Sequence, residues 1–160
     1  MKNKRIIGID VGGTNLKISL LDHSCRIIHK HTQLTEKFSQ QDSLIEGICA
    51  SVSDLMDQYR LGRSSVLGIG LGLPGPIDFD SGIVHFFPNI PGWKEVRLKN
   101  ILERKLKMPV FVDNDANVMA LAEYTCGAAK GSRNAVCLTL GTGVGGGLIL
   151  DNRLYRGSAY

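Results

Sequence analysis

The segment Val110–Asn117, which reads VFVDNDAN, constrains the fold more than any other part of the chain. It begins with apolar residues, as at the end of a buried parallel strand, and continues with a polar cluster. The next residues have the composition of a helix that Gly127 would end. Open α/β sheets bind ligands at the carboxyl ends of their strands, so this pattern predicts an α/β fold with a candidate ligand site at Asp113, Asn114 and Asp115.

Asp115 would stand at the N-terminus of the predicted helix. Taken alone, its carboxylate is as readily a helix cap, accepting hydrogen bonds from free backbone N–H groups, as part of a ligand site. A calcium loop is not indicated: counted from Asp113, the sixth residue is Val118 where such loops have glycine, and the twelfth is Tyr124 where they have glutamate. Other parts of the sequence are needed to tell whether Asp115 is a helix cap or part of a ligand site.

The composition limits the class of protein. A chain of 160 residues suits one domain, or one domain with part of another, and 43% hydrophobic with 21% charged residues is normal for a soluble globular protein. The net charge of +4 is mild and the basic residues are dispersed, which argues against a nucleic-acid-binding patch. The four cysteines form no C-x-x-C pair, so we expect neither a zinc site nor a disulfide framework, and free thiols indicate a reducing compartment.

The amino end does not predict a targeting or membrane segment. It is basic, but the apolar run that follows stops at Asp10 and is too short for a signal sequence or a membrane span. We therefore expect a cytoplasmic protein without a membrane partner.

Hydrophobic spacing predicts a meander of strands, then helices alternating with strands, then a new hairpin. The run at 65–73 is apolar and bounded by Pro74, as in a central buried strand, and the long segment after it has no helical period. In order, we expect strands at 5–10, 15–21 and 25–33, a helix at 39–59, a strand at 65–73, a loop or irregular hairpin at 77–93, a helix at 96–106, the strand and helix described above, and two strands around a glycine turn at 134–150.

Glycine is unusually frequent, with 19 of 160 residues against a usual ~7%, and the glycines cluster at strand ends. In the first cluster, Gly12 and Gly13 permit positive φ and can turn successive backbone N–H groups towards one anion, such as a phosphate. Thr14 and Lys17 add a hydroxyl and a cation, and Asp10 is placed to hold Mg²⁺ through water. A tight hairpin without a ligand is the alternative.

The second cluster consists of Gly141, Thr142 and Gly143. It has the same pattern of glycines at a strand end and could bind an anion in the same way. With Gly146 it also spells G-x-G-x-x-G, but a dinucleotide site needs a helix directly after the loop, and 148–150 read as a strand. The sequence contains no Walker P-loop, since no glycine is followed by Lys-Ser or Lys-Thr.

Three motifs stand in a characteristic order: DVGGTN at 10–15, NDAN at 114–117 and LGTGVGGG at 140–147. Together they resemble the ROK family of sugar kinases and related repressors, which belongs to the actin-like ATPase superfamily with a ribonuclease-H-like fold. The segments LPGPI at 73–77 and PNIPGW at 88–93 look like the family's sugar-side segments. The resemblance implies an N-terminal α/β domain over 1–130, with a mixed sheet flanked by helices, and the start of a second similar ATPase domain over 131–160.

The resemblance also implies roles for single residues. Asp115 matches the catalytic base beside the sugar, Asn114 matches a ligand of the sugar hydroxyls, and Gly75 and Asn89 fall near the sugar pocket. A first phosphate loop would use Asp10, Gly12, Gly13, Thr14, Asn15 and Lys17. A second would use Gly141, Thr142 and Gly143 and close on ATP from the other domain.

The implied activity is phosphoryl transfer from Mg-ATP to a hexose hydroxyl, with a sugar 6-phosphate as product and glucose as the family's commonest substrate. A kinase for fructose, allose or N-acetylmannosamine stays open, as does an inactive sugar-binding fragment. A sugar-sensing repressor of the same family is the rival from another class. Those repressors carry a helix-turn-helix domain ahead of the first loop, and only Met1–Lys4 precede the first strand here, so we expect no nucleic-acid partner. The expected assembly is a homodimer.

Members of the family are longer than this chain. The segments that supply a further sugar-binding Glu and His and a zinc-binding His-Cys cluster follow the position where it stops, so we expect an amino-terminal part, with structural zinc only in the downstream half. The hairpin at 134–155 would then lack a cover on its inner face. It is predicted to be mobile, domain-swapped or buried on a partner chain.

Overall fold

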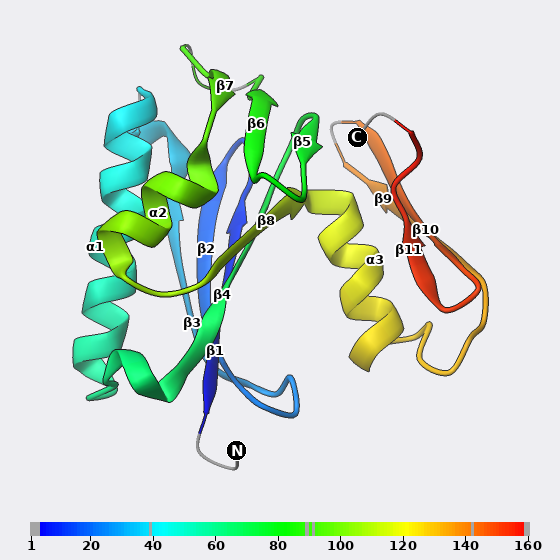
Figure 1. The fold of residues 1–160 in the computed structure, drawn as a ribbon, viewed down its shortest axis with the longest axis horizontal. Coiled ribbons are helices and arrows are strands. Elements are labelled where there is room, and N and C mark those ends of the chain that lie inside the picture. Colours follow the sequence, from blue (N-terminus) through cyan, green and yellow to red (C-terminus); the bar gives the residue numbers. More distant parts are fainter. Residues whose placement is uncertain (1–3, 39, 89, 91, 142, 159–160) are drawn as a thin grey trace.

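A computed structural model describes residues 4–38, 40–88, 90, 92–141 and 143–158. Its centre is a five-stranded mixed sheet of order β3-β2-β1-β4-β8 (Figure 1). The first three strands form an antiparallel meander, and β1, β4 and β8 are parallel to one another. The strands are β1 (Arg5–Val11), β2 (Asn15–Asp22), β3 (Ile27–Leu34), β4 (Val66–Leu73) and β8 (Val110–Asn114).

The burial of each strand agrees with the pattern of apolar residues in its sequence. In β1 and β2 alternate residues are buried, because one face of each strand lies on the core and the other does not. Strand β4 has six of its eight residues buried, as expected for a central parallel strand covered on both faces. The prediction of a central strand at 65–73 is confirmed.

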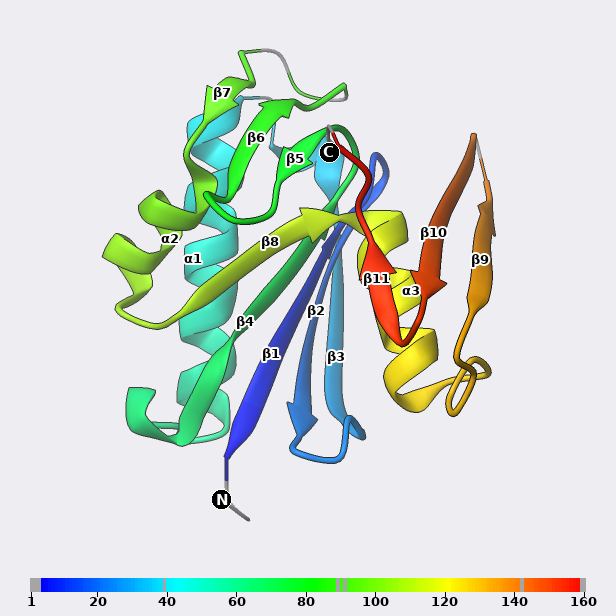
Figure 2. The ribbon, with the colours of Figure 1, turned by 45° about the vertical axis from the view of Figure 1, so that its right-hand side comes forward.

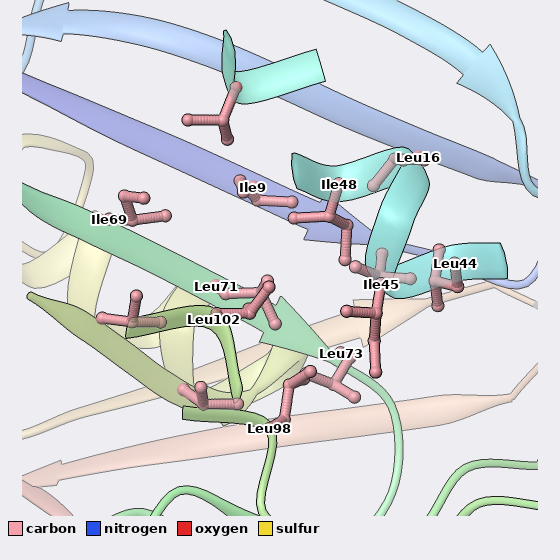
Figure 3. Packing of buried hydrophobic residues seen from close by; sticks show 14 of the residues in the cluster. Ile9, Leu16, Leu44, Ile45, Ile48, Ile69, Leu71, Leu73, Leu98 and Leu102 are labelled. Atoms are coloured by element: carbon pink, nitrogen blue, oxygen red, sulfur yellow. The ribbon is translucent and has the colours of Figure 1, made fainter. Parts of the chain in front are cut away.

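Helices cover both faces of this sheet. Helices α1 (Gln41–Gln58) and α2 (Leu98–Leu106) lie on one face, and α3 (Asp115–Cys126) lies on the other (Figures 1 and 2). Figure 3 shows the packing on the first face, where side chains of α1 and α2 meet those of β1, β2 and β4. The labelled core residues are Ile9, Leu16, Leu44, Ile45, Ile48, Ile69, Leu71, Leu73, Leu98 and Leu102.

The segment after β4, predicted as a loop or an irregular hairpin, forms a small antiparallel sheet, which agrees with the hairpin alternative. It has the order β5-β6-β7 and consists of β5 (Ile77–Asp78), β6 (Ile83–Phe86) and β7 (Lys94–Val96). These strands are too short to show a period of two in the sequence. The sheet lies at the end of the molecule where β4 and β8 finish (Figure 1). Short 3-10 turns at Thr35–Lys37 and Arg63–Ser65 precede α1 and β4.

A third sheet of order β11-β10-β9 follows α3. It comprises β9 (Ala135–Leu140), β10 (Val144–Leu150) and β11 (Arg153–Tyr155), which confirms the glycine-turn hairpin predicted near the end of the chain. Helix α3 lies between this sheet and the central one (Figures 1 and 2). Whether residues 131–160 belong to a separate domain stays a prediction.

The β9–β11 sheet is covered on one face only. On the α3 side, a Cβ on Gly147 would lie 2.5 Å from the Cβ of Ala120 and 2.9 Å from the carbonyl oxygen of Ala116, so only glycine allows this approach. Ile149 is fully buried on the same side. The other face exposes apolar side chains, namely Val136, Leu138, Leu140, Val144, Leu148 and Leu150. That the hairpin is mobile, swapped or buried on a partner stays a prediction.

No helix among the described residues is long and apolar enough to span a membrane.

Candidate active site

The first glycine turn joins β1 to β2 and is held by Thr35, a residue that the sequence did not single out. The backbone N–H of Gly12 donates to the carbonyl of Asn15 at 2.8 Å, and the buried Thr35 hydroxyl donates to the carbonyl of Gly12 at 2.8 Å. The N–H of Thr35 also donates to the carbonyl of Thr14 at 2.9 Å. Neither Gly12 nor Gly13 adopts the positive φ that glycine permits. A Cβ on Gly12 would lie 3.3 Å from the Asn15 carbonyl oxygen, which is a tight contact.

Asp10 and Lys17 face each other across this hairpin. They are direct partners in the register of β1 and β2, and the Lys17 Nζ lies 2.7 Å from Asp10 Oδ2. Both side chains are half exposed, at 40% for Lys17 and 49% for Asp10. The carboxylate is therefore accessible but already holds a cation, and a magnesium ion there would share it with the lysine. In the described part of the chain, no group of three or more His, Cys, Asp or Glu side chains is placed to hold a metal.

The second glycine turn joins β9 to β10. The N–H of Gly141 donates to the carbonyl of Gly143 at 2.9 Å, and a Cβ on either glycine would meet nothing within 4 Å. Thr142 lies outside the described residues. In both views the two glycine turns lie at the same end of the molecule, where β4 and β8 also finish (Figures 1 and 2).

Asn114 connects the end of β8 to the loop after β4. Its Oδ1 caps α3 by accepting from the N–H groups of Ala116 at 3.0 Å and Asn117 at 3.4 Å, and its Nδ2 donates to the carbonyl of Gly75 at 3.1 Å. Gly75 has φ +105°, and a Cβ there would overlap the Phe86 carbonyl oxygen, so the position favours glycine twice over. The structure thus brings Asn114 and Gly75 together, while Asn89 lies outside the described residues.

Asp115 begins α3 and is exposed. Its Oδ1 accepts a hydrogen bond from the N–H of Ala116 at 2.9 Å, and its Cα would lie 3.5 Å from a Cβ placed on Gly72 of β4. The capping role weighed from the sequence belongs mainly to Asn114, because Asn114 accepts from two free amides of the first turn. The assignment of Asp115 as a catalytic base stays a prediction.

The buried Asp113 carboxylate forms an ion pair with the partly exposed Arg156, and sequence reasoning did not assign this pair. Arg156 Nη2 lies 2.6 Å from Asp113 Oδ2, and the Asp113 side chain is only 7% exposed. Asp113 was predicted only as part of the polar cluster at the strand end. Its need for a charged partner could have been inferred from its place in β8, because it directly follows the apolar run of a buried strand, where an ionised group needs a partner. No local pattern around Arg156 predicts the contact.

These residues surround a cavity of about 440 Å³, a size that suits a small organic ligand. Its wall combines the loop after β4, the start of α3 and the β9–β11 sheet, which are far apart in the sequence. Asn114 and Gly75 belong to the wall, whereas Asp115 and the described residues of the two glycine turns do not. The lining residues are Gly75, Pro76, Ile77, Asn114, Asn117, Gly146, Gly147, Leu148, Tyr155, Arg156 and Gly157.

A mixed sheet of this order with helices on both faces is the actin-like ATPase fold, and the solved structures that resemble the chain include sugar kinases of that fold. The chain belongs to the ROK family, whose sequence profile matches residues 6–159. The resemblance noted from the three motifs is thereby confirmed.

Among curated relatives, a glucokinase of Halalkalibacterium halodurans is 38% identical over 157 residues, covering 98% of this chain and 47% of the relative. A xylose repressor of Caldicellulosiruptor bescii is 32% identical over 154 residues, covering 96% of this chain and 38% of the repressor. The crystal structure of a ROK family glucokinase from Streptomyces griseus with glucose and AMPPNP aligns with a TM-score of 0.85 at 35% identity, covering 97% of this chain and 47% of that chain. The chain therefore spans about half the length of such relatives.

Proposed function

We propose that the protein containing this chain is an ATP-dependent hexose kinase. The observation that carries the proposal is the cavity at the carboxyl ends of β4 and β8, where Asn114 and Gly75 form one wall and Asp115 is the next residue along the chain. Support comes from the glucokinase relative and from the glucose and AMPPNP complex of a similar structure. A cavity at this edge of an α/β sheet is also where ligands are expected.

In this proposal the hexose occupies the cavity with a hydroxyl directed at Asp115. The Asp115 carboxylate accepts the hydroxyl proton while that oxygen forms a bond to the γ-phosphorus of ATP, and the bond from that phosphorus to the bridging oxygen breaks, releasing ADP. Phosphoryl transfer asks the protein mainly for positioning and charge neutralisation, so one carboxylate near the hydroxyl is enough acid–base chemistry. Asn114 binds sugar hydroxyls, and the attacking group is the terminal one, giving a sugar 6-phosphate.

The phosphates of ATP would be held by the two glycine turns. The first turn would contribute Gly12, Gly13, Thr14, Asn15 and Lys17, and the second Gly141, Thr142 and Gly143. The N–H groups of Gly12 and Gly141 already donate to carbonyls within their own turns, so a phosphate would share them or draw on the neighbouring amides. Successive backbone N–H groups form an anion site without needing a cationic side chain. Asp10 would hold Mg²⁺ through water, and the same carboxylate would keep its ion pair with Lys17.

Glucose is the first candidate substrate, followed by fructose, allose and N-acetylmannosamine. Assembly as a homodimer and a cytoplasmic location belong to the same proposal. The resemblance places structural zinc only in a downstream half of such a protein, so no zinc ligand is assigned to the present chain.

A sugar-responsive regulator is the second candidate, because a xylose repressor shares 32% identity with the chain over 154 residues. The two candidates differ in one measurable activity: a kinase releases ADP when it phosphorylates a hexose, whereas a regulator binds the sugar without releasing ADP. The polypeptide containing this chain is incubated with Mg-ATP and a panel of hexoses, and ADP release is measured with a coupled assay. ADP release that depends on one hexose supports the kinase, whereas sugar binding without ADP release from any member of the panel overturns it in favour of the regulator.

A further inference from the structure

Arg156 reaches from the end of β11 to a buried carboxylate at the end of β8. Its Nη2 and Nε donate to the same oxygen, Asp113 Oδ2, at 2.6 and 3.2 Å. Its guanidinium carbon also lies 3.8 Å from the centre of the Phe79 ring. The Asp113 side chain is 7% exposed and that of Arg156 is 32% exposed. A guanidinium held by two hydrogen bonds and an aromatic face has little freedom to turn.

The other oxygen of Asp113 holds the residues around the cavity. Oδ1 accepts from the backbone N–H of Asn114 at 2.8 Å and from Nδ2 of Asn117 at 3.1 Å. Asn114 in turn caps α3 and donates to the carbonyl of Gly75. Arg156 and both asparagines line the same cavity. One carboxylate therefore connects Arg156 to the groups that surround the cavity.

We propose that Arg156 is a positioning residue: by holding Asp113, it fixes Asn114 and the first turn of α3 relative to the β9–β11 sheet, and thereby directs Asp115. The proposal rests on the proposed kinase function for its effect on turnover. The packing of Gly147 against Ala120 sets how close the β9–β11 sheet lies to α3, but such apolar contact is not directional. The ion pair is directional, because hydrogen bonds weaken steeply away from linear geometry.

A purely structural ion pair would make a different prediction. Removing Arg156 would then lower the stability of the whole chain, since Asp113 would be left buried and unpaired, without a selective change at the start of α3. The test therefore needs a local readout that is independent of activity. Hydrogen exchange of the backbone amides at 114–118, measured in the 160-residue chain without ligand, provides it.

The variants are Arg156→Ala and Arg156→Lys, with Arg133→Ala as the matched control. Arg133, just before β9, pairs at 2.8 Å with Asp151, in the turn after β10. The two side chains are 75% and 74% exposed, and neither lines the cavity. We expect Arg156→Ala to speed exchange at 114–118 while 66–73 keeps the wild-type rate. Arg156→Lys keeps the positive charge but not the planar guanidinium group, so its exchange rate at 114–118 should lie between those of wild type and Arg156→Ala. Arg133→Ala should exchange at the wild-type rate.

Kinetics give the second readout, in the polypeptide found to turn over a hexose. Arg156→Ala should lower kcat by roughly tenfold to a hundredfold and raise the KM for the hexose, with the KM for ATP unchanged, because small misplacements of reacting groups cost that much. Wild-type exchange at 114–118 in Arg156→Ala overturns the proposal. So does a uniform loss of protection in both Arg156 variants, which marks a folding contact. If even the wild type turns over no hexose, the kinase proposal fails, while the exchange data still decide whether Arg156 positions the strand end.

Discussion

The side-chain amide of Asn114 donates a 3.1 Å hydrogen bond to the backbone carbonyl of Gly75, which joins the end of β8 to the loop that leaves β4. The same side chain caps α3 with its oxygen. An amide satisfies both demands, because it carries a donor and an acceptor on one planar group. One side chain therefore links β8, α3 and the loop after β4 at the edge of the sheet where the cavity lies, and this relationship can be tested directly.

Substitutions of Asn114 should separate its two roles. Asn114→Ala removes the cap and the bond to Gly75, and should lower the free energy of unfolding by about 1–2 kcal/mol, as loss of a helix cap typically does. Asn114→Asp keeps an acceptor for the helix amides but cannot donate to the Gly75 carbonyl. It should keep most of the stability and lose hexose affinity.

Urea unfolding and calorimetric titration with the hexose measure the two effects. Equal stability of Asn114→Ala and wild type would show that the cap contributes nothing, and unchanged hexose affinity in Asn114→Asp would remove the residue from the sugar site.

Replacing Asp115 with Asn should abolish most of the turnover. If the carboxylate accepts the hydroxyl proton, kcat should fall about 10²–10⁴-fold, the usual range for loss of a general base, with little change in hexose affinity. The exposed Asp57→Asn on α1 is the control for loss of one negative charge. A coupled ADP-release assay measures kcat. Turnover by Asp115→Asn close to the wild-type rate would show that another group accepts the proton.

Gly147→Ala should push β10 away from α3. The new Cβ would lie 2.5 Å from the Cβ of Ala120 and 2.9 Å from the backbone oxygen of Ala116, and backbone cannot move aside as a flexible side chain can. Overpacking of this kind typically costs about 1–3 kcal/mol of unfolding free energy. Gly70→Ala in β4 is the control, because a Cβ there meets nothing within 4 Å. Thermal and urea unfolding of both variants test this, and equal stability of the two would contradict the packing.

The stability of the chain should fall at alkaline pH through Cys49. Burial, and to a smaller extent the nearby Glu46 carboxylate, raise the pKa of the Cys49 thiol above its ordinary value of 9.0. The folded state therefore favours the protonated thiol. Its contribution to stability is complete below pH 9.0 and is lost as the pH rises towards the folded pKa, because the unfolded chain releases the proton first.

Unfolding free energies between about pH 8 and 10.5 test this, since that window spans the ordinary thiol pKa. Cys49→Ala should reduce the alkaline decline. The part that remains should include Cys25, whose thiol pKa is also raised, mainly by burial and then by Cys126 beside it. An identical decline in wild type and Cys49→Ala would rule out this thiol as its source.

Most of the strands, helices and glycine turns could be predicted from the sequence because they depend on local patterns. The apolar run of β4, the strand and helix on either side of Asn114, and the two glycine turns each show within a few residues whether the chain is extended, helical or turning. The apolar run of β8 also predicted that the polar cluster after it lies at a strand end, and one residue of that cluster, Asn114, lines the cavity. Short strands such as β5 escaped prediction, because two residues cannot show a period.

Tertiary structure alone decided the contacts that shape the candidate site. Asp113 and Arg156 are 43 residues apart, and Thr35 supports Gly12 from 23 residues away. Local hydrophobic spacing carries no information about which distant side chain will satisfy a buried carboxylate or a turn carbonyl. Those partners are chosen only when the sheets and α3 pack, because a buried polar group must then find a hydrogen bond within its own surroundings.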